Sequence, residues 1–399
     1  MTRITFLLTQ GLEDPSGLGR YFPLAKELAK LGHEVSILAL HPDLGSLSQR
    51  RLEVGGVRVH YVGQMHVRKV GNQKTYFGKF GLARVVLAST LRMGLEALSN
   101  ETDVIHVGKP HPINGLAALG ARFLRGRRLY LDCDDYEAES NRFSGMWQKA
   151  VVAWWEDNLP RFARGMTVDT RFTQQRSIAL GFPAERIFFV PNGVDRERFG
   201  PIDPRQVQDL RQRLGLQDKS LVAYVGSMSL VSHPVGLLLD AFDIVRRRCG
   251  DSVLVLAGGG EDYDALRARA TELGLHGCAL FVGRVRPDEV PLYLAMADVS
   301  VEPVYDDLAA RARSPLKVLE SLAVGTPVVA GDVGDRREML GDGQAGVLVK
   351  PGDSDALAEG ILALLQDQER VQAMREAALR LRERHYWDVL VKDFVKVYD

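Results

Sequence analysis

The feature that most constrains the fold is a regular alternation of short apolar segments with longer segments of helical periodicity. Residues 4–9 and 33–40 have the pattern of buried strands, and residues 18–32 between them repeat apolar side chains at helical spacing. A strand, a helix and a second strand in this order predict a βαβ unit at the start of a parallel sheet. The chain is therefore predicted to be an α/β protein with a doubly wound sheet.

This alternation runs through the chain twice. Further strand-like segments follow at residues 57–63, 103–108, 128–134, 165–169 and 186–192, and a Pro-, Gly- and Asp-rich segment then spans residues 191–204. After it the alternation of strand-like and helical segments begins again at residue 221. Turn residues combined with a restart are typical of a domain boundary. Ligands of such folds bind at the carboxyl ends of the strands, which predicts two domains facing across a cleft.

Composition limits the classes of protein that this chain can belong to. Its 399 residues and 46% hydrophobic content suit two or three globular domains. Three scattered cysteines without C-x-x-C spacing argue against a disulfide framework or a zinc site. The amino-terminal residues predict a strand rather than a signal peptide, and no run approaches the ~18 apolar residues of a membrane span. We therefore predict a cytoplasmic protein.

Charge is balanced over the whole sequence but not along it. Residues 58–128 contain 12 Lys or Arg and only 3 Asp or Glu. Such an excess favours an anionic acceptor or peripheral contact with the inner face of a membrane, although an ordinary solvated face explains it equally. Trp147, Trp154 and Trp155 stand close to basic residues. We expect two of these three to pack in the core, and interfacial anchoring is the alternative.

Glycines follow several strands of the second half directly. They stand at Gly226, at residues 258–260 and at Gly283. A glycine in this place lets backbone N–H groups approach a phosphate, but it also simply makes a tight turn between strand and helix. Three such loops in one domain favour a nucleotide ligand.

The segment from Ser314 to Gly334 adds a charged helix start before an apolar strand. Ser314 is expected to cap the helix, and Pro315 suits its first turn. Lys317 would then stand beside outward-pointing backbone donors, and Glu320 one turn later could accept from ribose hydroxyls. The plain alternative for Lys317 and Glu320 is a solvated pair of charges.

Several stretches together resemble the donor domain of family-four retaining glycosyltransferases, the group 1 enzymes with the GT-B fold. They are residues 188–195, 237–242, 254–260, 281–285 and 314–330, in the family's order. The resemblance implies two Rossmann-like domains: residues 1–195 bind the acceptor, residues 196–383 bind the nucleotide sugar, and residues 384–399 form a helix that returns to the first domain.

The resemblance also implies site residues. In the catalytic set it places His111 against the sugar and Lys317 against the leaving diphosphate, with Asp134 a candidate to orient the acceptor hydroxyl. Glu320 is implied to hold the ribose. The remaining predicted donor contacts are Gly17, Gly19, Gly226, Gly259, Arg284, Ser314, Pro315 and Leu316.

The sequence departs from the family pattern at two places. Ala312 stands where many members have the first glutamate of an E-x7-E pair, and Ser227 or Met228 and His233 stand near the places of a usual Arg and Lys. Lys317, Arg284 or the arginines before Ser314 would have to supply the missing positive charge.

Asp132 and Asp134 form a D-x-D pattern that raises the question of a metal. Hard cations take carboxylate ligands, but the resemblance implies chemistry without a metal, so we predict no metal site. We also predict no cofactor besides the donor substrate, a UDP-, GDP- or ADP-linked sugar, and no nucleic-acid partner.

The predicted activity is retaining transfer of a sugar from a nucleotide-diphosphate sugar to a glycan or lipid-linked acceptor. Two alternatives stay open from the sequence. One is a catalytically silent GT-B subunit that binds a protein partner, and the other is a nucleotide-sugar epimerase of similar architecture.

Overall fold

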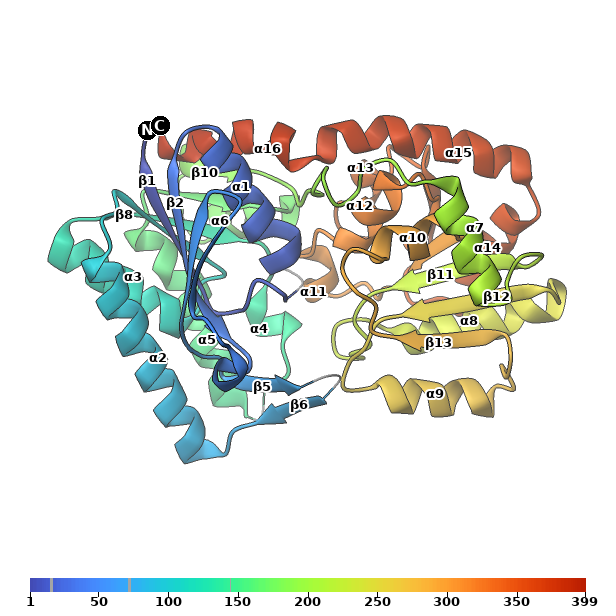
Figure 1. The fold of residues 1–399 in the computed structure, drawn as a ribbon, viewed down its shortest axis with the longest axis horizontal. Helices are drawn as coiled ribbons and strands as arrows, with labels where there is room; N and C mark the ends of the chain where they lie inside the picture. Colours follow the sequence, from blue (N-terminus) through green and yellow to red (C-terminus); the bar gives the residue numbers. More distant parts are fainter. Residues whose placement is uncertain (15–16, 71–72, 144) are drawn as a thin grey trace. The chain divides into compact units, whose positions relative to one another are not determined.

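The computed structural model describes residues 1–14, 17–70, 73–143 and 145–399, and these divide into two units. Unit 1 consists of residues 1–193, 312–314 and 387–399, and unit 2 of residues 194–311 and 315–386. Each unit has its own sheet of parallel strands between helices (Figure 1). The prediction of two doubly wound α/β domains is confirmed. The chain crosses between the units more often than the sequence suggested, because residues 312–314 belong to unit 1.

Unit 1 is built on an eight-stranded sheet in the order β10-β9-β8-β7-β1-β2-β4-β3. All neighbours are parallel except β3, which pairs antiparallel with β4. A separate antiparallel ribbon, β5 with β6, was not predicted. The strands are β1 Arg3–Leu8, β2 Glu34–His41, β3 Arg51–Val54, β4 Val57–Gln64, β5 Val67–Val70, β6 Gln73–Tyr76, β7 Val104–Gly108, β8 Arg128–Cys133, β9 Gly165–Val168 and β10 Ile187–Phe189.

Helices cover both faces of this sheet. One buried cluster joins β1 and β2 to α1 and α16, and a second joins the sheet to α2 and α3 on the other face. Helices α2 and α3 lie side by side (Figure 1). The helices of unit 1 are α1 Phe22–Lys30, α2 Lys79–Ser99, α3 Pro112–Arg125, α4 Glu137–Ser140, α5 Met146–Asn158, α6 Arg171–Ala179 and α16 Trp387–Phe394.

The carboxyl-terminal segment packs into unit 1. Phe394 of α16 lies 6.4 Å from Phe6 and 5.1 Å from His106, measured between ring centroids. The Trp387 indole N–H donates a hydrogen bond to the Gly19 carbonyl (2.8 Å). Aromatic burial of this kind is a large apolar contribution to stability. The helix itself is shorter than residues 384–399, since a 3₁₀ turn replaces it from Val395 on.

Unit 2 is built on a six-stranded parallel sheet in the order β13-β12-β11-β14-β15-β16. Its strands are β11 Ser220–Val225, β12 Ser252–Ala257, β13 Ala279–Gly283, β14 Val299–Glu302, β15 Val328–Gly331 and β16 Gly346–Val349. Its helices are α7 Pro204–Arg213, α8 Val235–Arg248, α9 Tyr263–Glu272, α10 Val290–Ala295, α11 Leu308–Arg311, α12 Leu316–Ala323, α13 Arg336–Met339, α14 Ser354–Leu365 and α15 Gln368–Leu381.

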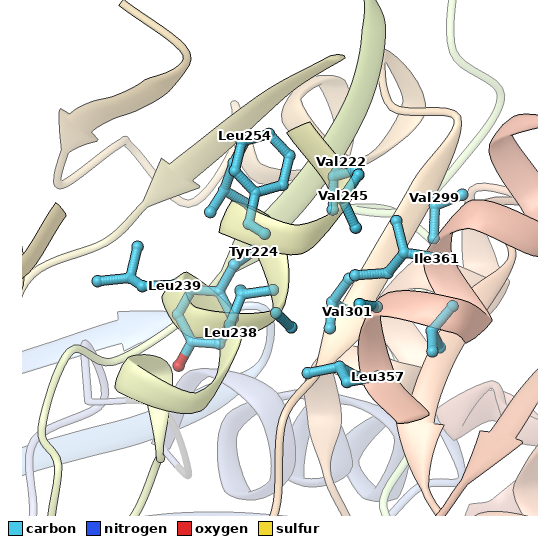
Figure 2. Packing of buried hydrophobic residues seen from close by; sticks show 14 of the residues in the cluster. Val222, Tyr224, Leu238, Leu239, Val245, Leu254, Val299, Val301, Leu357 and Ile361 are labelled. Carbon is cyan, nitrogen blue, oxygen red and sulfur yellow. The ribbon is translucent and has the colours of Figure 1, made fainter. Parts of the chain in front are cut away.

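The core of unit 2 forms between its central strands and two helices. Figure 2 shows side chains of β11, β12 and β14 meeting those of α8 and α14, with Leu238 of α8 and Leu357 of α14 among them. The strands read as continuous apolar runs because both faces of a parallel sheet are covered. This arrangement leaves the loops at the strand ends as the places where polar groups can gather.

The tryptophan prediction is wrong. Trp147 and Trp154 are 67% and 58% exposed, and of the three predicted only Trp155 packs inward, against Gly115. The two exposed residues stand seven positions apart on α5 and therefore share one side of the helix. In the part of the chain that the structure describes, no helix combines the length and the apolar character needed to cross a bilayer.

Candidate functional site

Close backbone contacts define the loops at the carboxyl ends of β11 and β12. The Gly226 N–H donates to the Ala257 carbonyl (2.9 Å), and Gly258 has φ +145°, where a Cβ would lie only 1.8 Å from the Gly226 carbonyl oxygen. A side chain at Gly258 is therefore excluded. The carbonyl of Gly259, a predicted donor contact, accepts the Met228 N–H (3.1 Å). Packing between the two loops is thus sufficient to require Gly258.

The loop after β13 joins the same series. Gly283 has φ +76°, and its carbonyl accepts the Gly258 N–H (2.7 Å). Arg284, the predicted donor contact that follows it, is exposed. The three glycine loops of unit 2 therefore form one hydrogen-bonded group at the strand ends.

Lys317 places a cation over this group. Its Nζ lies 3.1 Å from Nδ1 of His233 and 5.2 Å from the ring centroid of Tyr224. Its Cε lies 3.2 Å from where a Cβ of Gly226 would be, and the Tyr224 hydroxyl donates to the Ser227 carbonyl (2.6 Å). The structure thus brings together Lys317, Gly226 and His233, the residue near the place of the family's missing lysine.

The start of α12 differs from the prediction. Pro315, with φ −73° and ψ 110°, occupies the N-cap position, and α12 begins at Leu316. The prediction that Ser314 caps the helix is wrong, because its side chain has another partner. The Ser314 hydroxyl accepts the Asn192 backbone N–H (3.3 Å), and its carbonyl accepts the Asn192 amide (2.8 Å). Ser314 therefore fixes a chain crossing within unit 1. Pro315 is buried and Leu316 half-buried.

Glu320 has an ion-pair partner that sequence reasoning missed. Its Oε1 lies 3.4 Å from Nη2 of Arg198, whose Nε donates to the Pro287 carbonyl (3.0 Å). Burial raises the pKa of Glu320, while Arg198 and Lys317 act in the opposite direction. In the sequence, the only indication of this partner is the position of Arg198, three residues after the family stretch 188–195. A ribose bound at Glu320 would share the carboxylate with Arg198.

Packing explains the first of the two predicted glycines in the opening loop of unit 1. A Cβ on Gly17 would lie 2.2 Å from the Gly11 carbonyl oxygen and 2.8 Å from Cα of Leu12. The Gly19 carbonyl accepts the indole N–H of Trp387. Both belong to a π-helical turn, residues 17–21, that leads into α1.

A buried lysine organises the carboxyl ends of β7 and β8. Nζ of Lys109 lies 2.6 Å from Asp135, 2.9 Å from Glu137 and 3.6 Å from Asp134. We call Lys109 and these three carboxylates the Lys109 cluster. Burial opposes the charge on Lys109, but the carboxylates outweigh it and raise its pKa well above the usual value. Lys109 has φ 56°, and the Asn114 amide supports the bend by donating to the Lys109 carbonyl (3.1 Å).

Asp134 is the most buried carboxylate of the Lys109 cluster. Only 4% of its surface is exposed, and the Tyr21 hydroxyl donates to it (3.3 Å). Burial raises its pKa to about 7 against the opposing effect of Lys109. Asp169, after β9, is fully buried, has a raised pKa for the same reason, and has no hydrogen-bond partner for either oxygen among the described residues. Carboxylate oxygens thus gather at the ends of β8 and β9, beside Lys109 at the end of β7.

Asp132 has a structural partner. Arg20 donates from Nε (2.7 Å) and Nη2 (2.6 Å) to its two oxygens, and both side chains are fully buried. The Thr167 hydroxyl donates to the same carboxylate (2.5 Å). Burial would raise the pKa of Asp132, but Arg20 lowers it below the usual value. Nowhere in residues 1–14, 17–70, 73–143 and 145–399 do three His, Cys, Asp or Glu side chains stand close enough to hold one metal ion.

His111 is the N-cap residue of α3 and stacks on a second histidine. Its ring centroid lies 5.7 Å from that of His66, at an interplanar angle of 18°. Burial, with a smaller effect of His66, lowers the pKa of His111 to about 3. The imidazole is therefore neutral near pH 7 and can act there only by hydrogen bonding.

Sequence comparison decides the family. Residues 206–381 match the profile described as glycosyl transferases group 1, and residues 16–193 match the glycosyl transferase 4-like domain. The chain belongs to the group 1 glycosyltransferases. Together the two matches cover most of both units, so the predicted family and the GT-B fold are confirmed.

Curated relatives of this group 1 glycosyltransferase differ in how much of their length the chain matches. The GDP-mannose-dependent alpha-(1-6)-phosphatidylinositol monomannoside mannosyltransferase of Mycolicibacterium smegmatis is 33% identical over 52% of this chain and 55% of its own. An uncharacterized glycosyltransferase of Methanocaldococcus jannaschii is 25% identical over 94% of this chain and 92% of its own. The chain thus spans little more than half the length of the mannosyltransferase.

Solved structures support the fold at lower identity. Anabaena HepE in complex with UDP-glucose gives a TM-score of 0.73 at 22% identity, covering 100% of this chain and 99% of its own. Sucrose-phosphate synthase of Thermosynechococcus elongatus gives 0.76 at 18% identity, covering 100% and 98%. At these identities the likeness concerns the fold.

Proposed function

We propose that this chain is a retaining glycosyltransferase that moves a sugar from a nucleotide-diphosphate sugar to a hydroxyl of a glycan or lipid-linked acceptor. The bond between the anomeric carbon and the diphosphate oxygen breaks, and the diphosphate leaves with the electron pair. The acceptor oxygen forms the new bond to the anomeric carbon, and its proton passes to the released diphosphate. The observation that carries the proposal is Lys317, held over the glycine loop after β11 in the half of the chain that matches the group 1 profile.

In this proposal unit 2 binds the donor. Gly226 has no side chain, so a phosphate can approach the backbone of its loop beside Lys317. Lys317 attracts the diphosphate more strongly as negative charge develops on the leaving group, which lowers the barrier. Its contact with His233 orients the ammonium group. Glu320 accepts from the ribose hydroxyls, with Arg198 holding its carboxylate in place.

Unit 1 binds the acceptor in this proposal. The Lys109 cluster offers carboxylate oxygens after the end of β8, next to Lys109 at the end of β7, and Asp134 combines burial with a pKa near neutrality. A carboxyl group of this kind can accept a hydrogen bond from an acceptor hydroxyl or donate one. His111, neutral near pH 7, is the proposed hydrogen-bonding contact to the transferred sugar.

We also propose that transfer needs no metal ion and no further cofactor. Support comes from Asp132, the first carboxylate of the D-x-D pattern, because Arg20 occupies both of its oxygens. Turnover should therefore survive EDTA. Loss of turnover that Mn²⁺ or Mg²⁺ restores would contradict this part of the proposal.

The relatives named above support neither alternative function. A silent subunit would bind no nucleotide, and an epimerase would release an altered nucleotide sugar in the absence of any acceptor. Calorimetry with UDP, GDP and ADP separates the silent subunit from an enzyme. Analysis of recovered nucleotide sugar separates the epimerase.

The proposal is tested by a screen of UDP-, GDP- and ADP-sugars with released nucleotide as the readout. We expect one donor to be hydrolysed slowly, and Lys317→Ala to reduce that turnover by roughly 100-fold, as loss of one preorganised charge contact does. Lys219→Ala, an exposed lysine before β11, is the matched control and should leave turnover unchanged. Equal turnover in Lys317→Ala and Lys219→Ala would overturn the role of Lys317.

A further inference from the structure

Helix α2 presents an apolar stripe on the side that faces away from the sheet. Its buried residues Met93 and Ala97 pack toward the sheet. On the opposite side, large apolar residues recur at helical spacing and are 57–94% exposed: Phe80, Leu87, Leu91 and Leu95. A helix of a soluble domain normally places polar residues on that side, so this stripe needs an explanation.

Helices α3 and α5 continue the same layer and repeat the pattern. Phe123 of α3 is 66% exposed and contacts Phe162 edge to face, with 6.0 Å between ring centroids. On α5, Trp147, Val151 and Trp154 follow one another at four and three residues and are 42–67% exposed. Trp155 packs inward on Gly115 of α3 and joins the two helices. We call the outward sides of α2, α3 and α5 the outer helix face.

The charges around the outer helix face are mostly positive. Lys79, Arg84, Arg92 and Arg125 are exposed on α2 and α3. The acidic residues of the three helices have partners: Arg51 and His60 contact Glu96, Arg176 contacts Asp157, and Glu156 accepts the backbone N–H groups of Glu137 and Ala138. The face is therefore apolar and basic at once.

A basic cavity opens beside the stripe of α2. It has a volume of about 240 Å³, and Arg50, Arg92 and Leu95 line it together with His60 and Glu96. Two arginines next to an exposed leucine suit a group that is anionic at one end and apolar at the other. A phospholipid has this chemistry.

We propose that the outer helix face docks onto an anionic lipid bilayer. Tryptophan and phenylalanine side chains favour the boundary between headgroups and acyl chains, and arginine and lysine bind the lipid phosphates. A second copy of the chain fits less well, because a symmetric contact would bring the same basic residues together.

Docking in this way bears on the reaction. His111 is the N-cap residue of α3, and Glu156 of α5 accepts a hydrogen bond from the backbone N–H of Glu137, the first residue of α4 and a member of the Lys109 cluster. Docked helices would thus fix the proposed acceptor groups at the bilayer surface. This step rests on the proposed function and names its acceptor class as lipid-linked.

The experiment is flotation of the full chain with phosphatidylcholine vesicles, with and without phosphatidylglycerol, at low and high salt. It needs no donor sugar, so its result is independent of the proposed activity. We expect binding only to the anionic vesicles, weakened by salt. Trp147→Ser with Trp154→Ser, and separately Leu87→Ser with Leu91→Ser, should each lower the partition coefficient by at least about tenfold.

Leu31→Ser is the matched control. Leu31 is 49% exposed and follows α1, which covers the other face of the sheet, so this variant should bind vesicles like the unmodified chain. Unchanged unfolding midpoints in all variants exclude misfolding. The proposal is overturned if the chain ignores anionic vesicles at low salt, if the two double variants bind as well as Leu31→Ser, or if the same substitutions instead dissolve a dimer seen by sedimentation.

Discussion

The two sheets end in loops of opposite character. In unit 1 the strand ends carry buried charges, with Lys109 among carboxylates and Arg20 paired to Asp132. In unit 2 they carry glycines whose backbones touch, as Gly258 does with Gly226. The same fold thus builds its strand ends mainly from paired side chains in one unit and mainly from close backbone contacts in the other. In the proposed function, this difference suits an acceptor that varies between enzymes and a diphosphate that does not.

The largest effect is expected from breaking the buried pair of unit 1. Arg20→Ala leaves Asp132 charged and without its partner in a site closed to water. The free energy of unfolding should fall by about 3–5 kcal/mol, measured by urea denaturation. Arg3→Ala removes a half-exposed pair with Asp103 and should cost under about 1 kcal/mol. Equal losses in the two variants would show that the buried pair contributes no more to the free energy of unfolding than the half-exposed pair.

A slightly smaller loss should follow from a side chain in the backbone-lined loops of unit 2. Gly258→Ala places Cβ against the Gly226 carbonyl in a left-handed conformation, and we expect about 3 kcal/mol of destabilisation. Gly236→Ala in α8 meets no atom within 4 Å and should stabilise by up to ~1 kcal/mol. Urea denaturation compares the two. A stable Gly258→Ala protein would mean that the loops separate easily.

The next prediction concerns Glu320, the proposed ribose contact of unit 2. Glu320→Gln keeps the shape but weakens the acceptor for ribose hydroxyls, so nucleotide affinity measured by calorimetry should fall about tenfold. Arg198→Gln tests the alternative that the carboxylate serves only its ion pair. If both variants lose equal stability and bind nucleotide normally, Glu320 is structural and the ribose site lies elsewhere.

The last prediction concerns pH and Asp134. Because its pKa is raised to about 7, the folded protein keeps a proton that the unfolded chain releases near pH 4. This contribution is fully present below about pH 4 and is lost as the pH rises toward 7. The lowered pKa of Asp132 acts in the opposite sense, but only below about pH 4, so it does not offset the effect of Asp134 between pH 4 and 7. In Asp134→Asn the urea midpoint should depend less on pH between about pH 4 and 7 than in the unmodified chain. Identical pH dependence in the two proteins would contradict the raised pKa of Asp134.

Much of the fold was readable from local patterns. Apolar runs predicted the central strands, the glycine loops followed them directly, and the stretch 314–330 carried the family resemblance. The short strands β3, β5 and β6 were not predicted, because four-residue strands that contain polar residues have no distinct hydrophobic period. The candidate donor residues could be named from sequence, but Arg198 could not.

The sequence by itself determined which segments become strands and helices, because periodicity and turn residues act over a few positions. Tertiary structure alone decided which distant residues meet. Arg20 binds Asp132, which is 112 positions away in the sequence. Asn192 binds Ser314 across 122 positions, so the Ser314 hydroxyl does not cap α12 as predicted. It also decided that Trp147 and Trp154 face outward. Burial depends on what the rest of the chain covers, and no local pattern contains that information.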